Sequence, residues 1–137
     1  MNDETNPDFK IMRDGTWYHE GAPIMRAALA KLFSDRALSI DETGKYWLKT
    51  PFEQYPVEVE DVPYVIVGYD GLDLRTNMEE HIEMTANTNW KLRQGVPYIE
   101  VRAGLYARIG RATLYNMIEE FGEAIKVDGT VFPLGEV

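Results

Sequence analysis

The sequence predicts an α+β protein made of two related βαββ-type repeats joined by an antiparallel β segment. Two segments, residues 23–35 and 110–121, carry apolar residues at helical spacing. Most of the remaining chain consists of short apolar or alternating runs bounded by Gly, Pro and Asp, which is typical of strands. The chain also resembles itself when it is shifted by 85 residues.

The first repeat is expected over residues 9–56. Its strands are expected at 9–12, 17–20, 37–40 and 45–50. The helix is expected to run from about Pro23 to Asp35, because proline has no backbone N–H to lose at the first helical position. Its apolar stripe consists of Met25, Ala28, Leu29, Leu32 and Phe33.

The bridging segment, residues 57–89, and the second repeat, residues 90–137, are also rich in expected strands. The bridge contains strands at 57–60, 64–67, 72–76 and 81–84. The second repeat contains strands at 98–102, 105–108, 124–127 and 130–134, with a helix at 110–121. That helix is expected to end at Gly122, because a helix C-terminus favours a residue with positive φ.

The internal similarity relates residues 22–47 to residues 107–132. Seven of these 26 positions are identical without a gap, including Arg26, Leu29 and the hairpin glycine Gly44. Because helix, strand and hairpin glycine all coincide, we interpret the similarity as a duplicated βαββ unit. Chance similarity between two amphipathic helices is the alternative.

The composition is that of a globular protein and excludes several classes. The 137 residues suffice for one domain or two very small halves, and the absence of cysteine excludes a disulfide framework and a thiolate metal site. A net charge of −9 argues against nucleic acid as a general partner, and no apolar run is long enough to span a membrane. Residues 1–8 are polar and acidic, so a disordered tail is expected there rather than a secretory signal. These features together predict a cytoplasmic protein.

Charge is unevenly distributed along the chain. Residues 51–89 carry nine acidic residues and one basic residue, whereas residues 90–111 carry five basic residues and one acidic residue. Arg102, Arg108 and Arg111 gather around the start of the second helix, where guanidinium groups and a helix N-terminus favour an anion. The alternative is that this basic stretch pairs internally with the acidic segment or is a solvated face.

Trp17 and His19 are the other candidate ligand-binding residues, on an aromatic strand of the first repeat. His19 and Glu20 are adjacent and would suit general acid–base chemistry, but neighbouring strand residues point to opposite faces. No nucleophile, phosphate-loop or metalloprotease motif is present. The sequence therefore assigns no catalytic residue, and it predicts neither a metal site nor a cofactor.

Several short motifs stand in order along nearly the whole chain, from about Phe9 to Gly135. They are Arg13–Gly21, Thr50-Pro51, Val59–Tyr64, Arg75–Asn77, Pro97–Arg102, Gly104-Leu105, Ala107–Ile109 and Phe132–Gly135. This set resembles the uncharacterised bacterial family called domain of unknown function 1285. The resemblance implies an α+β protein built from repeated structural motifs. A role in signal transduction has been suggested for that family, and the resemblance supplies no catalytic residue.

Two functions from different classes remain open. The first is a non-catalytic regulatory module that binds a small anionic ligand or a protein partner. Its candidate residues are Trp17, His19, Arg102, Arg108 and Arg111. The second is a small enzyme acting on an anionic metabolite, with His19 as general base and the arginines holding the anion. Self-association into a homodimer is a third hypothesis, because the edge strands of small sheets favour pairing.

Overall fold

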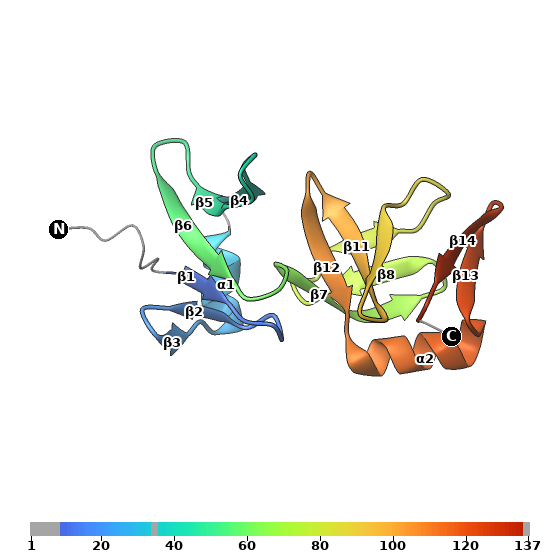
Figure 1. Cartoon of the computed structure of the whole chain (residues 1–137). Helices are drawn as coiled ribbons and strands as arrows, with labels where there is room; N and C mark the ends of the chain where they lie inside the picture. Colours follow the sequence, from blue (N-terminus) through green and yellow to red (C-terminus); the bar gives the residue numbers. More distant parts are fainter. Residues whose placement is uncertain (1–8, 34–35, 136–137) are drawn as a thin grey trace. The chain divides into compact units, whose positions relative to one another are not determined.

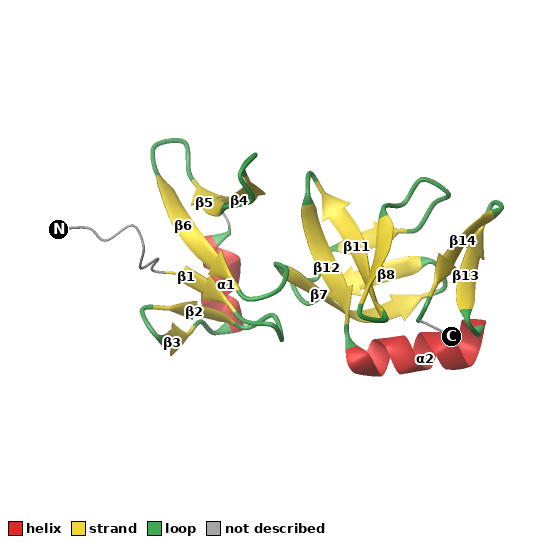
Figure 2. Ribbon diagram, viewed as in Figure 1, coloured by secondary structure: helices red, strands yellow, loops and turns green. Residues whose placement is uncertain are grey.

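The computed structural model describes residues 9–33 and 36–135, and the chain divides into two compact units, residues 1–63 and 64–137. The tail expected at residues 1–8 and the helix end expected at residues 34–35 lie outside the described residues. Strands predominate in both units, and each unit has one helix (Figure 2). None of the helices in the described part of the chain is long and apolar enough to cross a membrane.

The first unit contains one six-stranded sheet and the helix α1 (Figure 1). Its elements are β1 (Phe9–Ile11), β2 (Trp17–His19), β3 (Ala22–Pro23), α1 (Arg26–Leu32), β4 (Ala37–Ile40), β5 (Tyr46–Lys49) and β6 (Gln54–Val59). The strands lie in the order β3-β2-β1-β6-β5-β4. Neighbouring strands are antiparallel, apart from the central pair β1 and β6, which is parallel.

The second unit contains a six-stranded sheet, the helix α2 and a separate hairpin. The sheet strands are β7 (Tyr64–Asp70), β8 (Asp73–Thr76), β9 (His81–Glu83), β10 (Trp90–Arg93), β11 (Val96–Arg102) and β12 (Leu105–Ile109). They lie in the order β10-β11-β12-β7-β8-β9, again with a parallel central pair, β7 and β12. The elements α2 (Arg111–Phe121), β13 (Ala124–Val127) and β14 (Thr130–Pro133) follow.

The two sheets have the same topology, which confirms the prediction of an α+β fold with two related halves. Each sheet consists of two three-stranded antiparallel segments, and the first strand of one segment pairs in parallel with the last strand of the other. In this correspondence β1 is equivalent to β7 and β6 to β12. The helices are not equivalent in it, because α1 lies between β3 and β4 whereas α2 follows β12. The shift of 85 residues therefore aligns two similar strand–helix–hairpin segments and not the two sheets.

The expected start of the first helix at Pro23 is wrong. Pro23 lies in the edge strand β3, where it pairs with Tyr18, and α1 begins at Arg26. Proline suits an edge strand because its missing N–H removes no bond on the outer side of the sheet. Helical spacing alone does not distinguish an edge strand that leads into a helix from the first turn of the helix.

The second predicted helix is confirmed as α2, with Gly110 directly before it and Gly122 directly after it. Gly110 precedes α2, and its N–H donates to Ile66 O at 3.0 Å. A Cβ at Gly110 would lie 2.8 Å from that oxygen, so only glycine permits this close approach. Gly122 follows α2 with φ 85° and ψ −141°, a conformation that L side chains rarely adopt.

The hairpin between β4 and β5 is organised by one carboxylate. Asp41 accepts hydrogen bonds from Thr43 Oγ1 at 2.6 Å, from Trp47 Nε1 at 2.9 Å and from Lys45 N at 3.0 Å. These donors, with the Thr43 hydroxyl first among them, hold the pKa of Asp41 well below its ordinary value. The hydrogen bonds of the hairpin therefore favour the ionised form of Asp41.

Each unit has its own apolar core, and in the first unit the core lies on one face of the sheet. In the first unit the buried residues alternate along the strands, and they include Phe9, Ile11, Trp17, Leu38, Leu48 and Val57. In the second unit the core includes Ile66, Leu74, Ile99, Leu105, Ile109, Met117 and Leu134. The cores fix the face of each strand, and in the first unit that face also carries the candidate site.

Candidate ligand-binding site

The candidate site is a cavity of about 350 Å³ in the first unit. Its lining comes from β1, β2 and β6 on one side and from α1 with its flanking residues on the other. The lining residues are Phe9, His19, Ile24, Ala28, Leu32, Arg36 and Tyr55. A volume near the lower end of the usual range for ligand pockets, about 300–1,000 Å³, suits a small molecule.

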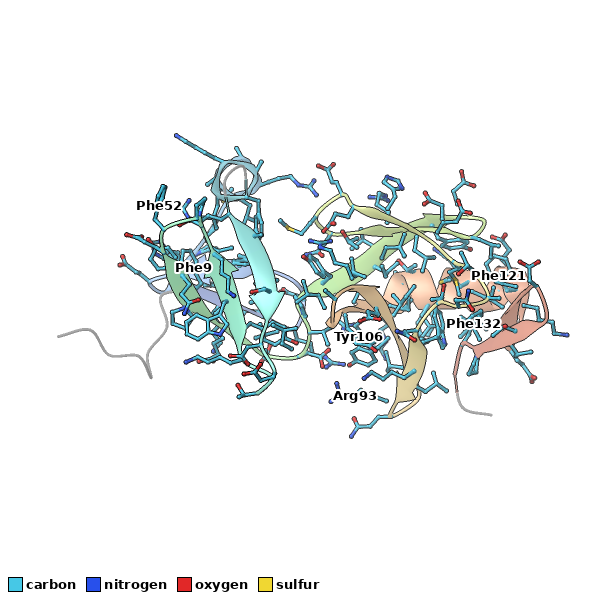
Figure 3. The ribbon with its side chains drawn as sticks, turned by 90° about the horizontal axis from the view of Figure 1, so that it is seen from above. Phe9, Phe52, Arg93, Tyr106, Phe121 and Phe132 are labelled. Atoms are coloured by element: carbon cyan, nitrogen blue, oxygen red, sulfur yellow. The ribbon has the colours of Figure 1, made fainter. Side chains whose placement is uncertain are left out.

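The sheet register brings three aromatic side chains of the cavity together. Phe9 on β1 lies opposite His19 on β2 and opposite Val57 on β6. Tyr55 precedes Val57 by two residues and therefore points to the same face as Phe9. Figure 3 shows Phe9 among the side chains of this sheet. The parallel pairing of β1 with β6 thus completes the aromatic wall.

The rings of this wall have defined mutual orientations. His19 stacks on Phe9, with centroids 4.5 Å apart and an interplanar angle of 14°. Tyr55 meets Phe9 edge to face at 6.1 Å and 68°. Offset stacking and edge-to-face packing are the favourable arrangements of aromatic rings. The wall is therefore held in place by contacts among its own members.

The opposite wall is aliphatic and comes from the helix segment. Ala28 and Leu32 are four residues apart in α1, which places their side chains on one face of the helix, and Ile24 lies just before the helix begins. None of the residues of α1 is buried. The α1 side of the cavity is therefore loosely packed, and a bound molecule would add contacts to it.

Three polar side chains line the cavity, and one of them carries a permanent positive charge. Arg36 contributes a guanidinium group, His19 an imidazole ring and Tyr55 a hydroxyl group. The Tyr55 hydroxyl donates to the Glu53 carboxylate, which raises the pKa of Tyr55, while the nearby charge of Arg36 acts in the opposite direction. The lining contains no carboxylate. The cavity therefore offers a mostly apolar lining with a few polar groups to a small molecule.

The structure places the two sequence-predicted residues of the first unit differently. His19 lines the cavity. Trp17 is 1% exposed and is not a lining residue; its ring contacts Phe33 edge to face at 5.2 Å and Phe9 at 6.3 Å. Of the pair, His19 lines the cavity and Trp17 packs in the core.

The three candidate arginines belong to the second unit and have different surroundings. Arg102 pairs with the Glu80 carboxylate and donates to Tyr64 Oη at 3.0 Å. Burial raises the pKa of that tyrosine, although the charge of Arg102 opposes the shift.

Arg108 lies opposite Tyr98 in the β11–β12 ladder, and the exposed Arg111 donates to Tyr115 Oη at 3.2 Å. Figure 3 labels Arg93 and Tyr106, two more residues of the basic stretch, in this unit. Their hydrogen bonds and ion pair give Arg102 and Arg111 roles within the unit.

Motifs and charge did not identify Arg36 and Tyr55 as candidate site residues. Arg36 lies beyond the end of α1 at Leu32, so helical spacing does not account for its place in the lining. Tyr55 had no local signal either, because only the β1–β6 pairing brings it to Phe9.

Some residues of the motifs that resemble the family hold turns and strands together. Arg13 forms an ion pair with Asp61 at 3.2 Å, and its backbone N–H donates to Glu60 Oε1 at 2.6 Å. Asn77 exchanges two hydrogen bonds with the backbone of Val65. These motifs therefore hold turns and strand ends in place.

A metal site has no candidate in the described part of the chain. Residues 9–33 and 36–135 contain no group of three or more His, Asp or Glu side chains placed to hold an ion. His81 and Asp73 form a pair, with 2.6 Å between Nδ1 and Oδ2. The candidate site accordingly rests on the cavity.

The fold and the cavity define an α+β protein of two strand-rich units, the first of which carries a candidate small-molecule site. The chain belongs to the DUF1285 family. Residues 2–62 match the N-terminal domain of the domain of unknown function DUF1285, and this match coincides with the first compact unit.

Two solved structures of that family are similar to the chain. A DUF1285 family protein from Shewanella baltica OS155 is 30% identical with a TM-score of 0.70, and the match covers 87% of this chain and 95% of that one. A DUF1285 family protein from Silicibacter pomeroyi DSS-3 is 29% identical with a TM-score of 0.78, and the match covers 96% of this chain and 81% of that one. No curated protein matches the chain.

Proposed function

We propose that the chain is a regulatory module without catalytic activity, whose first unit binds a small ligand between α1 and the sheet. The main support for this proposal is the cavity of about 350 Å³, which has an aromatic wall, an aliphatic wall and three polar side chains. A mostly apolar cavity with a few polar groups is the usual form of a small-molecule site.

The sparse packing of α1 against the sheet supports the proposal that ligand binding has a regulatory effect. None of its residues is buried, and Ala28 and Leu32 line the cavity. A ligand that contacts this wall favours the state in which α1 is formed and packed, because binding stabilises whichever state makes the contacts. A partner that recognises α1 would then respond to the ligand, which is the coupling that signal transduction requires. The cytoplasm is the proposed compartment, in agreement with the absence of cysteine.

A screen of small molecules by thermal shift tests this proposal with two matched variants. Ala28→Trp fills the cavity, whereas Ala27→Trp makes the same change at a neighbouring exposed position that does not line it. A ligand at about 100 times its Kd stabilises the folded state by about 2.7 kcal/mol. We expect such stabilisation in the wild type and in Ala27→Trp, and its loss in Ala28→Trp. Equal stabilisation in all three proteins, or in none, would contradict the proposal.

A small enzyme acting on an anionic metabolite is the second candidate function. Its specific support is that His19 and Arg36 line the same cavity, so a base and a cation would both face the bound molecule. Mass spectrometry of a ligand from the screen, after incubation with the protein, separates the two functions. Conversion that is lost in His19→Gln supports the enzyme, and an unchanged ligand supports the regulatory module.

A further inference from the structure

We infer that the edge strand β10 binds an acidic, extended segment of another protein, which joins the sheet of the second unit as a further strand. β10 lies at one end of the strand order and pairs only with β11 among the described residues. It runs from Trp90 to Arg93 without a proline or a bulge. Such an edge offers backbone groups to which an extended peptide can pair. This surface belongs to the second unit alone and is independent of the cavity of the first unit.

The register leaves two residues of β10 with backbone groups that point away from the sheet. At the end of the β10–β11 pairing, Glu100 N donates to Asn89 O at 3.0 Å. Hydrogen-bonded and non-hydrogen-bonded pairs alternate in an antiparallel ladder, so the N–H and C=O groups of Trp90 and Leu92 point away from β11. These four groups have no hydrogen-bond partner in the described part of the chain. The backbone of an added strand would supply one for each of them.

Lys91 and Arg93 make one face of this edge cationic. Both side chains are exposed, and they share a face because they are two residues apart. Lys91 Nζ lies 4.3 Å from the centre of the Tyr106 ring, and Arg93 Cζ lies 5.2 Å from the centre of the Tyr98 ring. Within residues 9–33 and 36–135, neither cation forms an ion pair. The cation–π contacts hold both charges over the sheet, where a carboxylate can approach them.

Glu100 lies on the same face, but its carboxylate has other partners. It accepts hydrogen bonds from the side-chain amide of Asn89 and, at 2.7 Å, from Gly104 N. These bonds, with that from Asn89 first, lower the pKa of Glu100, and the charge of Lys91 contributes to a smaller extent. A carboxylate that arrives opposite Lys91 or Arg93 therefore displaces no ion pair of either cation.

The other face of β10 favours apolar residues at alternate positions of the partner. Trp90 and Leu92 point to that face and are half-buried. Trp90 is fixed there, because its Nε1–H donates to Pro133 O at 2.8 Å and its ring meets the Phe132 ring edge to face at 5.7 Å. Side chains opposite each other on neighbouring strands interact directly. The matching segment therefore alternates acidic residues with apolar ones.

The two cations also oppose pairing of β10 with the β10 of a second copy. Such a pair would bring Lys91 and Arg93 of one copy close to the same residues of the other. Like charges at opposite positions of two strands are destabilising, whereas opposite charges are favourable. The charge of the edge therefore selects an acidic strand over a second β10.

Isothermal titration of the full chain with a synthetic peptide, acetyl-Thr-Glu-Val-Glu-Val-Glu-Thr-amide, tests the inference. A peptide with Gln in place of each Glu removes the charge and is expected to bind about tenfold more weakly, since each exposed ion pair contributes a factor of about two to five. Two further peptides carry N-methyl groups, one at the valines and one at the glutamates. We expect one of these two to lose binding and the other to keep it, because a strand directs alternate amides to each neighbour.

Variants locate the binding on the protein. Lys91→Gln and Arg93→Gln are each expected to weaken the acidic peptide about threefold, whereas Lys126→Gln, at an exposed position of β13, leaves the affinity unchanged. Leu92→Pro removes an N–H that points away from β11 and is expected to weaken the peptide at least about tenfold. Circular dichroism shows whether Leu92→Pro keeps the fold, and the N-methylated peptides decide the question if it does not.

Three results would overturn the inference. Equal binding of the acidic and the glutamine peptides would refute selection by charge, and equal binding of both N-methylated peptides would refute pairing at the strand edge. If no peptide binds, Lys91 and Arg93 serve only to protect the edge from aggregation. Sedimentation of the protein without peptide covers the last case: a dimer that Leu92→Pro dissociates, together with no peptide binding, would assign the edge to a second copy.

Discussion

Replacement of Trp17 by alanine tests whether this side chain is part of the core of the first unit. Trp17 is 1% exposed, and its ring contacts Phe33 at 5.2 Å and Phe9 at 6.3 Å. Truncation of a buried tryptophan to alanine costs about 3–5 kcal/mol. Proteins of this size are stable by about 5–15 kcal/mol in total. We therefore expect Trp17→Ala to remove a large share of the stability of the first unit.

Replacement by phenylalanine separates packing from the indole N–H group. The Nε1 atom of Trp17 is buried and has no hydrogen-bond acceptor among the described residues. An unsatisfied buried donor costs about 1–3 kcal/mol, and Trp17→Phe removes it while keeping a ring against Phe33. The relief offsets part of the packing lost with the smaller ring. We therefore expect Trp17→Phe to change stability by less than about 1.5 kcal/mol.

Urea unfolding followed by circular dichroism measures both variants against the wild type. The expected order of midpoints is wild type close to Trp17→Phe, with Trp17→Ala far lower and the slopes unchanged. An equal loss in the two variants would refute the argument about the N–H group. A small loss in both would refute the placement of Trp17 in the core. Trp17→Phe is also expected to keep the thermal shift caused by a ligand from the screen, because Trp17 does not line the cavity.

Three further predictions concern a hairpin, a polar network and a helix end. Asp41→Asn is expected to destabilise the protein at neutral pH but not in strong acid. A carboxyl group whose pKa is lowered by folding stabilises the fold at pH values above its ordinary pKa of 3.8, and this stabilisation is lost as the pH falls through the pKa of the folded state. An effect that does not change with pH in urea titrations would contradict this. Tyr64→Phe removes the hydrogen bond from Arg102 and is expected to cost about 1.5–3 kcal/mol in urea unfolding, against about 0.5 kcal/mol or less for Tyr69→Phe at an exposed hydroxyl; equal costs would argue against the network. Gly122→Ala is expected to cost about 1–3 kcal/mol, because its backbone conformation strains an L residue although no atom blocks a Cβ; a cost near zero would show that the helix end relaxes.

The sequence predicted elements whose signals are local. The helix that begins at Arg111 followed from apolar spacing closed by Gly122, and the structure confirms it. The turn around Gly71 followed from an Asp-Gly pair between apolar runs, and β7 and β8 flank it. Periodicity and turn chemistry act over a few residues, so a single sequence carries them in full.

The order of the strands could not be predicted, because it depends on contacts between distant segments. The parallel pairs Phe9 with Val57 and Tyr64 with Ala107 join the two three-stranded segments at the centre of each six-stranded sheet, and no local pattern encodes them. The same pairs reveal the relation between the two halves. The similarity at a shift of 85 residues instead followed the helices, whose apolar spacing is easier to detect.

The candidate site was predictable only in part for the same reason. His19 was identified from its chemistry and its aromatic neighbours, and it lines the cavity. Arg36 was overlooked because the local excess of positive charge at residues 90–111 drew attention to another part of the chain. Net charge along a sequence therefore gave no indication of a cavity whose lining contains a single arginine.

Nuclear Overhauser contacts between the methyl groups of the protein and a ligand found by the thermal-shift screen test the central claim most directly, because the aliphatic wall consists of methyl-bearing residues. Bound ligand in the cavity predicts contacts from its protons to the methyl groups of Ile24, Ala28 and Leu32. The exposed Val131 in the second unit serves as the internal control and should show none. Contacts that avoid the three wall residues, or that appear at Val131 instead, would contradict a ligand-binding cavity in the first unit.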